Sequence, residues 1–158
     1  MATATNNAPA NGRASTLKTT FSRETAVRIS IQADPAIIWA LLTRASDYPR
    51  WNSTVISIEG TIASGETVKL KSKLDPKRIF KLRVKQFEPE KQLAWGDGTG
   101  TRTYTLTKNG GAVIFTMHEK IGGFLFPLFT GMIPSFDESF NQFAADLKKE
   151  AETIMNSK

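Results

Sequence analysis

The sequence has no cysteine and a single histidine, His118, among its 158 residues. Without cysteine the chain can form no disulfide, no thiolate zinc site and no cysteine nucleophile. One histidine also excludes a metal site built from several imidazoles. No nucleophile motif and no cluster of metal ligands stands out elsewhere. We therefore expect no metal and no cofactor.

Long apolar runs are lacking as well. The most apolar segment, residues 121–133, is too short to span a bilayer and is interrupted by glycine and proline. The first residues contain no apolar run flanked by basic residues, which a secretory signal peptide requires. From these two absences we expect a cytoplasmic protein.

Positive charge is concentrated in one stretch of the chain. The net charge is +6, and residues 69–85 carry eight basic side chains against one acid, Asp75. The eight are Lys69, Lys71, Lys73, Lys77, Arg78, Lys81, Arg83 and Lys85. Such a face is usually a solvated surface, and weak contact with an anionic membrane is the sharper hypothesis. We expect no nucleic-acid partner, because no aromatic residues interleave with the basic ones on that face.

The length and the apolar content suit one domain with a real core. Residues 1–20 are mostly Ala, Thr, Asn and Ser, and we expect them to be a disordered tail before a single domain at 21–158.

Period-two alternation predicts a strand near 27–33, and the Asp34-Pro35 pair predicts the start of a short helix at 35–43. A second short helix or turn follows at 45–51. From 54 to 120 the pattern is strand and turn, with a hairpin at Asn109-Gly110.

The last quarter of the chain, residues 122–156, predicts a long amphipathic helix. From Phe136 onward the apolar residues recur every three or four positions, which places them on one helical face. Pro134 should kink this helix or split it. An apolar stripe of this length needs a curved β-sheet as its partner. The fold class is therefore α+β.

One phrase of the sequence carries a family resemblance. It is Ala-Asp-Pro-Ala-Ile-Ile-Trp-Ala-Leu-Leu at 33–42, followed by Asp-Tyr-Pro-Arg-Trp-Asn at 47–52. Together with the order of the elements, it resembles the START-like (SRPBCC) superfamily, in its polyketide cyclase/dehydrase and lipid-transport branch. The resemblance implies a helix-grip fold: a seven-stranded antiparallel sheet wrapped around a long C-terminal helix, two short helices after the first strand, and an apolar cavity between them.

The resemblance implies binding or transport of a small hydrophobic ligand, such as a lipid, a sterol or a polyketide-like molecule. Two alternatives stay open. One is a polyketide cyclase, dehydratase or aromatase that works without metal. The other is an interaction protein whose cavity has collapsed. A polar floor on which His118 and Arg102 converge would favour the enzyme, and a wholly apolar pocket would favour carriage.

The candidate ligand-binding residues are aromatic and apolar side chains of the predicted strands, helices and turns. They are Tyr48, Trp51, Leu70, Phe80, Leu82, Trp95, Tyr104, Phe115, Met117, Phe126, Phe129, Met132, Phe136 and Phe140. The alternative is that they are plain core, because aromatic stripes at helical spacing usually are. His118 and Arg102 are the catalytic candidates, as a general acid or base and its neighbour. The sequence leaves open which face of 112–119 points inward.

Overall fold

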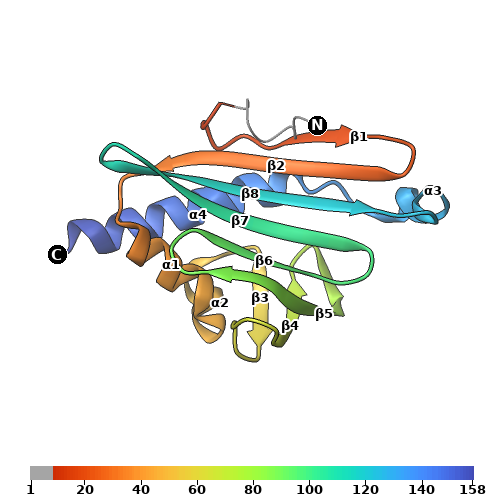
Figure 1. The fold of residues 1–158 in the computed structure, drawn as a ribbon, viewed down its shortest axis with the longest axis horizontal. Helices are drawn as coiled ribbons and strands as arrows, with labels where there is room; N and C mark the ends of the chain where they lie inside the picture. Colours follow the sequence, from red (N-terminus) through yellow and green to blue (C-terminus); the bar gives the residue numbers. More distant parts are fainter. Residues whose placement is uncertain (1–8) are drawn as a thin grey trace.

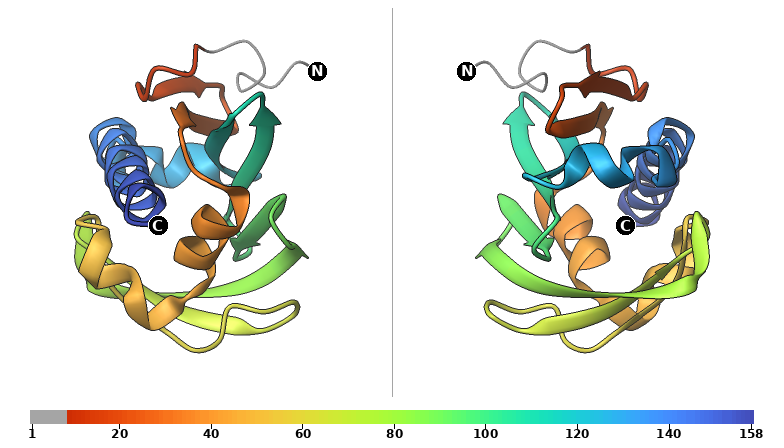
Figure 2. Two further views of the ribbon diagram at one scale, coloured as in Figure 1. Left: turned by 90° about the vertical axis from the view of Figure 1, so that its left-hand side faces the viewer. Right: turned by 90° about the vertical axis from the view of Figure 1, so that its right-hand side faces the viewer.

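The protein folds as one antiparallel sheet curled around a long C-terminal helix (Figure 1). This computed structural model describes residues 9–158. Within this range the sheet has eight strands in the order β1-β2-β8-β7-β6-β5-β4-β3. Seen along the long axis, the strands form a deep trough, and α4 lies across its open side (Figure 2). The predicted α+β helix-grip fold is confirmed, with eight strands rather than seven.

The elements follow one another in a simple order. The first half comprises β1 (Ser15–Lys18), β2 (Ser22–Ile31), α1 (Pro35–Thr43), the 3₁₀ turn η1 (Ala45–Asp47), α2 (Tyr48–Trp51), β3 (Val55–Glu59), β4 (Thr67–Ser72) and β5 (Asp75–Glu88). The second half comprises β6 (Gln92–Gly96), β7 (Gly100–Asn109), β8 (Ala112–Gly122), α3 (Phe126–Phe129), the 3₁₀ turn η2 (Thr130–Met132) and α4 (Asp137–Asn156).

Strand β1 lies within the stretch that composition predicts to be a disordered tail. It pairs antiparallel with β2, with Ser15 opposite Ala26 and Lys18 opposite Arg23. The hydroxyl of Thr16 also donates to the Asp137 carboxylate at the start of α4, at 2.5 Å. The tail prediction is therefore wrong for residues 15–18, because an edge strand can be held by its backbone without apolar side chains. Residues 1–8 of the predicted tail lie outside the described residues.

The alternating pattern of β4 and β5 divides the two faces of the sheet as predicted. Val68 and Leu70 are buried, whereas Lys69 between them is exposed. Across the strand pair, Leu70 lies opposite Phe80 and Val68 opposite Leu82. Because side chains two residues apart share a face, the apolar residues line the trough and the lysines point to solvent.

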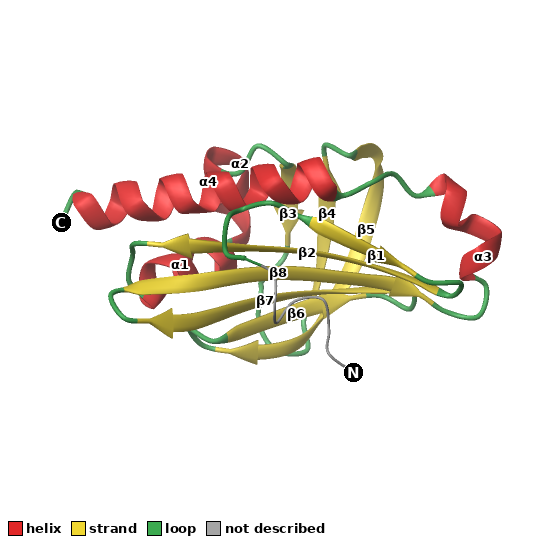
Figure 3. Ribbon diagram, turned by 90° about the horizontal axis from the view of Figure 1, so that it is seen from above, coloured by secondary structure: helices red, strands yellow, loops and turns green. Residues whose placement is uncertain are grey.

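The predicted helix over 122–156 is wrong in its first half. Strand β8 continues to Gly122, and Gly123 then turns the chain with a φ of 133°. Two short helical turns, α3 and η2, project from this end of the sheet, and α4 begins only at Asp137 (Figure 3). Prolines 127 and 134 explain the division, because proline lacks the backbone N–H that a continuous helix needs.

The solid core lies toward the α1 and α2 end of the trough. Phe143 of α4 is the centre of an aromatic cluster. Its ring centroid lies 5.7 Å from Tyr104, 5.8 Å from Trp51, 6.2 Å from Phe115 and 6.3 Å from Tyr48. The Tyr48 hydroxyl donates to the Leu42 carbonyl at 2.7 Å, so this buried phenol is satisfied. This end of the trough is closed.

Candidate functional site

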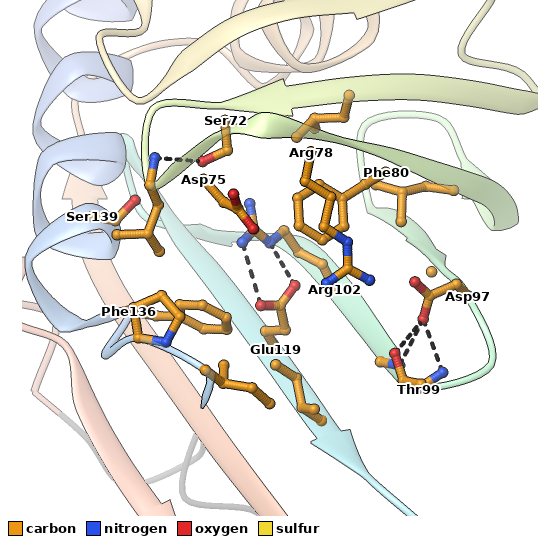
Figure 4. Close-up of a pocket in the computed structure, with 18 of the residues that line it drawn as sticks. Ser72, Asp75, Arg78, Phe80, Asp97, Thr99, Arg102, Glu119, Phe136 and Ser139 are labelled. Atoms are coloured by element: carbon orange, nitrogen blue, oxygen red, sulfur yellow. Dashed lines mark hydrogen bonds and ion pairs between the residues drawn. The ribbon is translucent and has the colours of Figure 1, made fainter. Parts of the chain in front are cut away.

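The other end of the trough holds a cavity of about 540 Å³. Its walls come from β4, β5, β6, β7 and β8, from the start of α4 and from the α3–η2 segment. Figure 4 shows the side chains of the sheet and those of the helix pointing toward one another across this space. Because the core residues of α4 begin at Phe140, the first turn of the helix leaves the trough unfilled here.

Apolar side chains form one side of the cavity. Seven of the predicted ligand-binding residues line it: Leu70, Phe80, Leu82, Trp95, Phe129, Met132 and Phe136. Ile121 and Ile133 add further apolar surface. Met132 is 83% exposed and therefore lies at the rim rather than inside. The period-two alternation of β4 and β5 is what turns Leu70, Phe80 and Leu82 to this face.

An ion pair forms the polar floor. Arg102 on β7 and Glu119 on β8 are paired across the two strands and meet in a bidentate contact. Nε of Arg102 lies 3.1 Å from Oε1 of Glu119, and Nη2 lies 3.4 Å from Oε2 (Figure 4). Their side chains are 21% and 16% exposed, and both line the cavity. Arg102 also lies over the Phe140 ring, 5.1 Å from its centroid.

The surroundings of Arg102 keep it charged. Burial disfavours its charged form, but the Glu119 carboxylate and the Tyr104 hydroxyl outweigh that cost and hold the pKa of Arg102 above its usual value. Burial raises the pKa of Tyr104, against the opposing effect of Arg102. Arg102 is therefore a permanent cation, and Tyr104 is a neutral phenol at physiological pH.

Asp97 lies at the edge of the cavity, in the turn between β6 and β7. Its carboxylate accepts hydrogen bonds from the Thr99 backbone N–H at 2.8 Å, the Thr99 hydroxyl at 2.8 Å and the Gly100 N–H at 3.0 Å. Partial burial opposes ionisation, but these donors and the charge of Arg78 lower the pKa of Asp97. Arg78 itself lies over the Phe80 ring, 4.4 Å from its centroid.

The remaining seven predicted ligand-binding residues do not line the cavity. Tyr48, Trp51, Tyr104, Phe115, Met117, Phe126 and Phe140 are all buried in contact with other side chains instead. Tyr48 and Trp51 belong to α2, which places them in the aromatic cluster at the closed end. Phe140 points into the trough, yet its ring stacks on that of Phe136 with centroids 6.0 Å apart. Only the edge of that stack reaches the cavity, through Phe136.

The catalytic candidates lie on opposite faces of the sheet. Alternation along β8 turns Phe115, Met117 and Glu119 into the trough and places His118 on the outer face. There Nε2 of His118 lies 3.0 Å from a carboxylate oxygen of Glu24 on β2. His118 and Arg102 therefore do not converge. This also answers which face of the 112–119 strand points inward.

Sequence reasoning missed Glu119 as the partner of Arg102. The two residues are 17 positions apart, and the register of β7 against β8, which brings them together, cannot be read directly from the sequence. The signal that could have found it is the hairpin turn, provided that its two loop residues are taken as Gly110 and Gly111. Asn109 then lies opposite Ala112, and counting back pairs Arg102 with Glu119, whereas a loop at Asn109-Gly110 would pair Arg102 with Met117. Among residues 9–158 no group of three or more histidine or acidic side chains could hold a metal ion. Within the same range, no helix combines the length and the apolar character needed to cross a membrane.

Comparison with known proteins agrees with the fold. The family model described as "Polyketide cyclase / dehydrase and lipid transport" matches residues 22–152. No curated protein matches the sequence.

Solved structures with the same fold are distant in sequence. A protein of Rhodobacter sphaeroides is similar with a TM-score of 0.66 and 16% identity, over 89% of this chain and 99% of that one. A START superfamily protein from Mycobacterium smegmatis has a TM-score of 0.61 and 12% identity, over 83% and 98% of the two chains. DynU16, described as a putative protein in the dynemicin biosynthetic locus, has a TM-score of 0.63 and 17% identity, over 84% of this chain and 48% of its own. At these identities the similarity shows the fold alone.

Proposed function

The chain belongs to the polyketide cyclase/dehydrase and lipid transport family, and on that premise we propose that it binds a small hydrophobic molecule in its cavity and carries it without chemical change. One observation supports this more than any other: a space of about 540 Å³ remains open between the sheet and the start of α4, lined largely by apolar side chains. Burial of apolar ligand surface there would contribute about 25 cal/mol per Å².

The cavity also argues against the reading as an interaction protein with a collapsed interior. The phenylalanines of α4 fill only one end of the trough, around Phe143. At the other end Phe129 and Phe136 line open space.

Uptake of a neutral apolar dye such as Nile red tests the proposal directly. We expect the dye to bind with a blue-shifted, enhanced emission. Leu82→Glu, which places a charge on the apolar side of the cavity, should abolish the signal, whereas Lys81→Glu on the solvent face of the same strand should leave it intact. Equal uptake by wild type and Leu82→Glu would contradict the assignment of the cavity. Native mass spectrometry of protein purified from its own source would identify any small molecule that the cavity retains.

A second candidate, a cyclase or dehydratase, is favoured by one feature, the charged floor formed by Arg102 and Glu119. In this alternative Glu119 would take a proton from the substrate and Arg102 would stabilise the developing enolate. The expected histidine is absent from this floor, since His118 lies on the outer face. Incubation with a poly-β-ketone substrate decides between the two: a new product that Glu119→Gln cannot make would establish the enzyme.

The predicted membrane contact through the basic faces of β4 and β5 stays a prediction, as does the cytoplasmic location. The lysines of those strands do point outward, as the contact would require. Binding to anionic vesicles that falls as salt rises would support it.

A further inference from the structure

The Arg102–Glu119 pair determines what kind of polar group the cavity can accept. Building on the proposed function, we infer that the ligand is an amphiphile with an uncharged head group, a hydroxyl or a carbonyl, and that Glu119 excludes carboxylates. Nothing in the family description distinguishes between charged and uncharged ligands.

The pair has hydrogen-bonding capacity left over for such a head group. A guanidinium has five N–H donors, and Glu119 occupies one on Nε and one on Nη2 of Arg102. The Tyr104 hydroxyl is a further partner of the guanidinium. The donors that are left can serve a ligand oxygen, and the carboxylate of Glu119 can accept from a ligand hydroxyl. A neutral head group can therefore be satisfied at the floor while its apolar chain lies along Leu70, Leu82 and Trp95.

The charge balance of the cavity disfavours an anionic head group. Five charged side chains line it: Arg78 and Arg102 are basic, and Asp75, Asp97 and Glu119 are acidic. The lining thus carries one net negative charge. A ligand carboxylate would add a second negative group beside Glu119 at a site mostly removed from water, where like charges repel strongly.

Neutralising Glu119 should reverse the preference. In Glu119→Gln the buried guanidinium of Arg102 loses its counter-charge, so a ligand carboxylate becomes the partner that it lacks. In Arg102→Gln/Glu119→Gln both charges are gone, and the uncharged head group should again be preferred. Glu88→Gln, the same substitution at an exposed position on the far part of β5, is the matched control.

The test is displacement of Nile red by decan-1-ol and by decanoate at pH 7.5, where decanoate is ionised. For wild type and Glu88→Gln we expect decanol to displace the dye at a concentration about tenfold lower than decanoate. Glu119→Gln should invert that order, and the double variant should restore it. The same order in wild type and Glu119→Gln, or preference of the wild type for decanoate, would overturn the inference.

Failure of this inference is distinguishable from failure of the proposed function. If wild type takes up no Nile red, the cavity does not bind apolar molecules at all. If it takes up the dye and both competitors displace it equally, the cavity binds but Glu119 does not select the head group. If Glu119→Gln does not fold, Arg102→Gln/Glu119→Gln still tests the role of the ion pair. A preference of this double variant for decanoate over decanol would contradict the inference.

A separate observation concerns the surface around the mouth of the cavity. The segment that runs from Phe124 through α3 and η2 exposes large apolar side chains to solvent: Phe124 is 88% exposed, Leu128 80% and Met132 83%. Phe21, in the adjoining β1–β2 turn, is also exposed, and its carbonyl accepts a hydrogen bond from the Gly123 N–H at 3.0 Å. We call these four side chains the apolar tip. From them we propose that this end of the molecule docks onto an anionic phospholipid membrane.

Charge and shape favour a membrane as the occupant. Lys85 and Lys120 line a shallow hollow beside the tip, together with Phe21 and Gly123. Asp97 lines it as well, so the charged side chains of the hollow carry one net positive charge. Basic residues near an anionic surface are attracted to it, and apolar side chains among them enter the interface. A second copy of the chain fits less well, because a stable dimer buries about 800 Å² on each partner and this segment projects as only two short helical turns (Figure 3).

The position of the tip would connect the membrane to the cavity. Met132 belongs to the tip and also lines the cavity, and Phe129 of the same segment lines the cavity as well. A ligand leaving the bilayer at this point would meet apolar side chains rather than water.

Sedimentation with vesicles tests this second proposal. We expect wild type to bind vesicles of phosphatidylcholine with 30% phosphatidylserine at least fivefold better than pure phosphatidylcholine, with the difference shrinking as salt rises. Phe124→Ser/Leu128→Ser should lose binding to both. Ile56→Ser, an exposed apolar residue on the edge strand β3, should bind like wild type.

Two results would overturn the membrane proposal. One is equal vesicle binding by wild type and Phe124→Ser/Leu128→Ser. The other is a wild-type dimer in light scattering that the same substitutions convert to a monomer, which would assign the tip to a second copy of the chain.

Discussion

Replacement of Phe143 by alanine tests where the solid core ends and the cavity begins. The Phe143 ring is 1% exposed and has four aromatic neighbours with centroids between 5.7 and 6.3 Å away. Those neighbours come from α2, β7 and β8 and are themselves almost wholly buried, so they cannot collapse into the space left behind. Under these conditions Phe→Ala costs about 3–5 kcal/mol.

The assay is urea unfolding followed by circular dichroism. With a denaturant dependence of about 2 kcal/mol per molar urea, a loss of about 4 kcal/mol lowers the midpoint by roughly 2 M. Phe136→Ala is the matched comparison. Its ring borders the open cavity and is only partly buried, so its removal should cost about 1–2 kcal/mol. An equal or larger shift for Phe136→Ala would refute the division of the trough into a packed end and a hollow end.

Three further substitutions distinguish the cavity from the core and from the outer face of the sheet, and a fourth tests the contribution of the Asp97 carboxylate to stability. Phe129→Asp should abolish Nile red uptake while the far-ultraviolet spectrum stays native, whereas Phe140→Asp should unfold the protein, because its ring is 1% exposed. His118→Gln should leave dye uptake unchanged, since the imidazole lies on the outer face against Glu24; lost uptake would contradict that placement. The lowered pKa of Asp97 stabilises the fold above the unfolded value of about 3.9, and this stabilisation disappears as the pH falls through the lower folded value. Asp97→Asn should therefore melt below wild type at pH 6, with the gap in Tm narrowing toward pH 2.5.

The strands were predictable because apolar and charged side chains alternate along them with a period of two residues. Lys69 and Lys81 alternate with Leu70 and Leu82, and this pattern alone places the apolar residues in the trough. The hairpin between β7 and β8 was predictable from its turn residues, but its loop lies one residue later than Asn109-Gly110. Asn109 is the last residue of β7, and the loop is Gly110 and Gly111, with a φ of 63° at Gly110.

The start of the last helix was predicted too early because residues 122–135 were joined to it on their apolar character alone, whereas the helical spacing begins only at Phe136. Residues 122–132 are rich in phenylalanine and leucine, but Gly123 ends β8 with a positive φ and Pro134 separates the short turns from α4. The result is an exposed turn instead of a buried helix face. Sequence composition cannot tell the two apart, because both are apolar.

The candidate site was predictable only in part, for a reason of topology. Leu70, Phe80 and Leu82 could be assigned to the inner face from local alternation. Tyr48 and Tyr104 share their aromatic character, yet packing against Phe143 removes them from the cavity. Which end of the trough is filled depends on where α2 and α4 meet, and that contact joins residues nearly a hundred positions apart.

The central claim is that an apolar guest lies at the α3 end of the trough. Intermolecular nuclear Overhauser effects between decan-1-ol and selectively labelled methyl groups test it most directly. The account predicts contacts to the methyls of Leu70, Leu82 and Ile133, which line the cavity, and none to those of Ile38 and Leu42, which are buried near α2. Contacts to Ile38 and Leu42, or none to the cavity methyls when decanol is saturating, would contradict it.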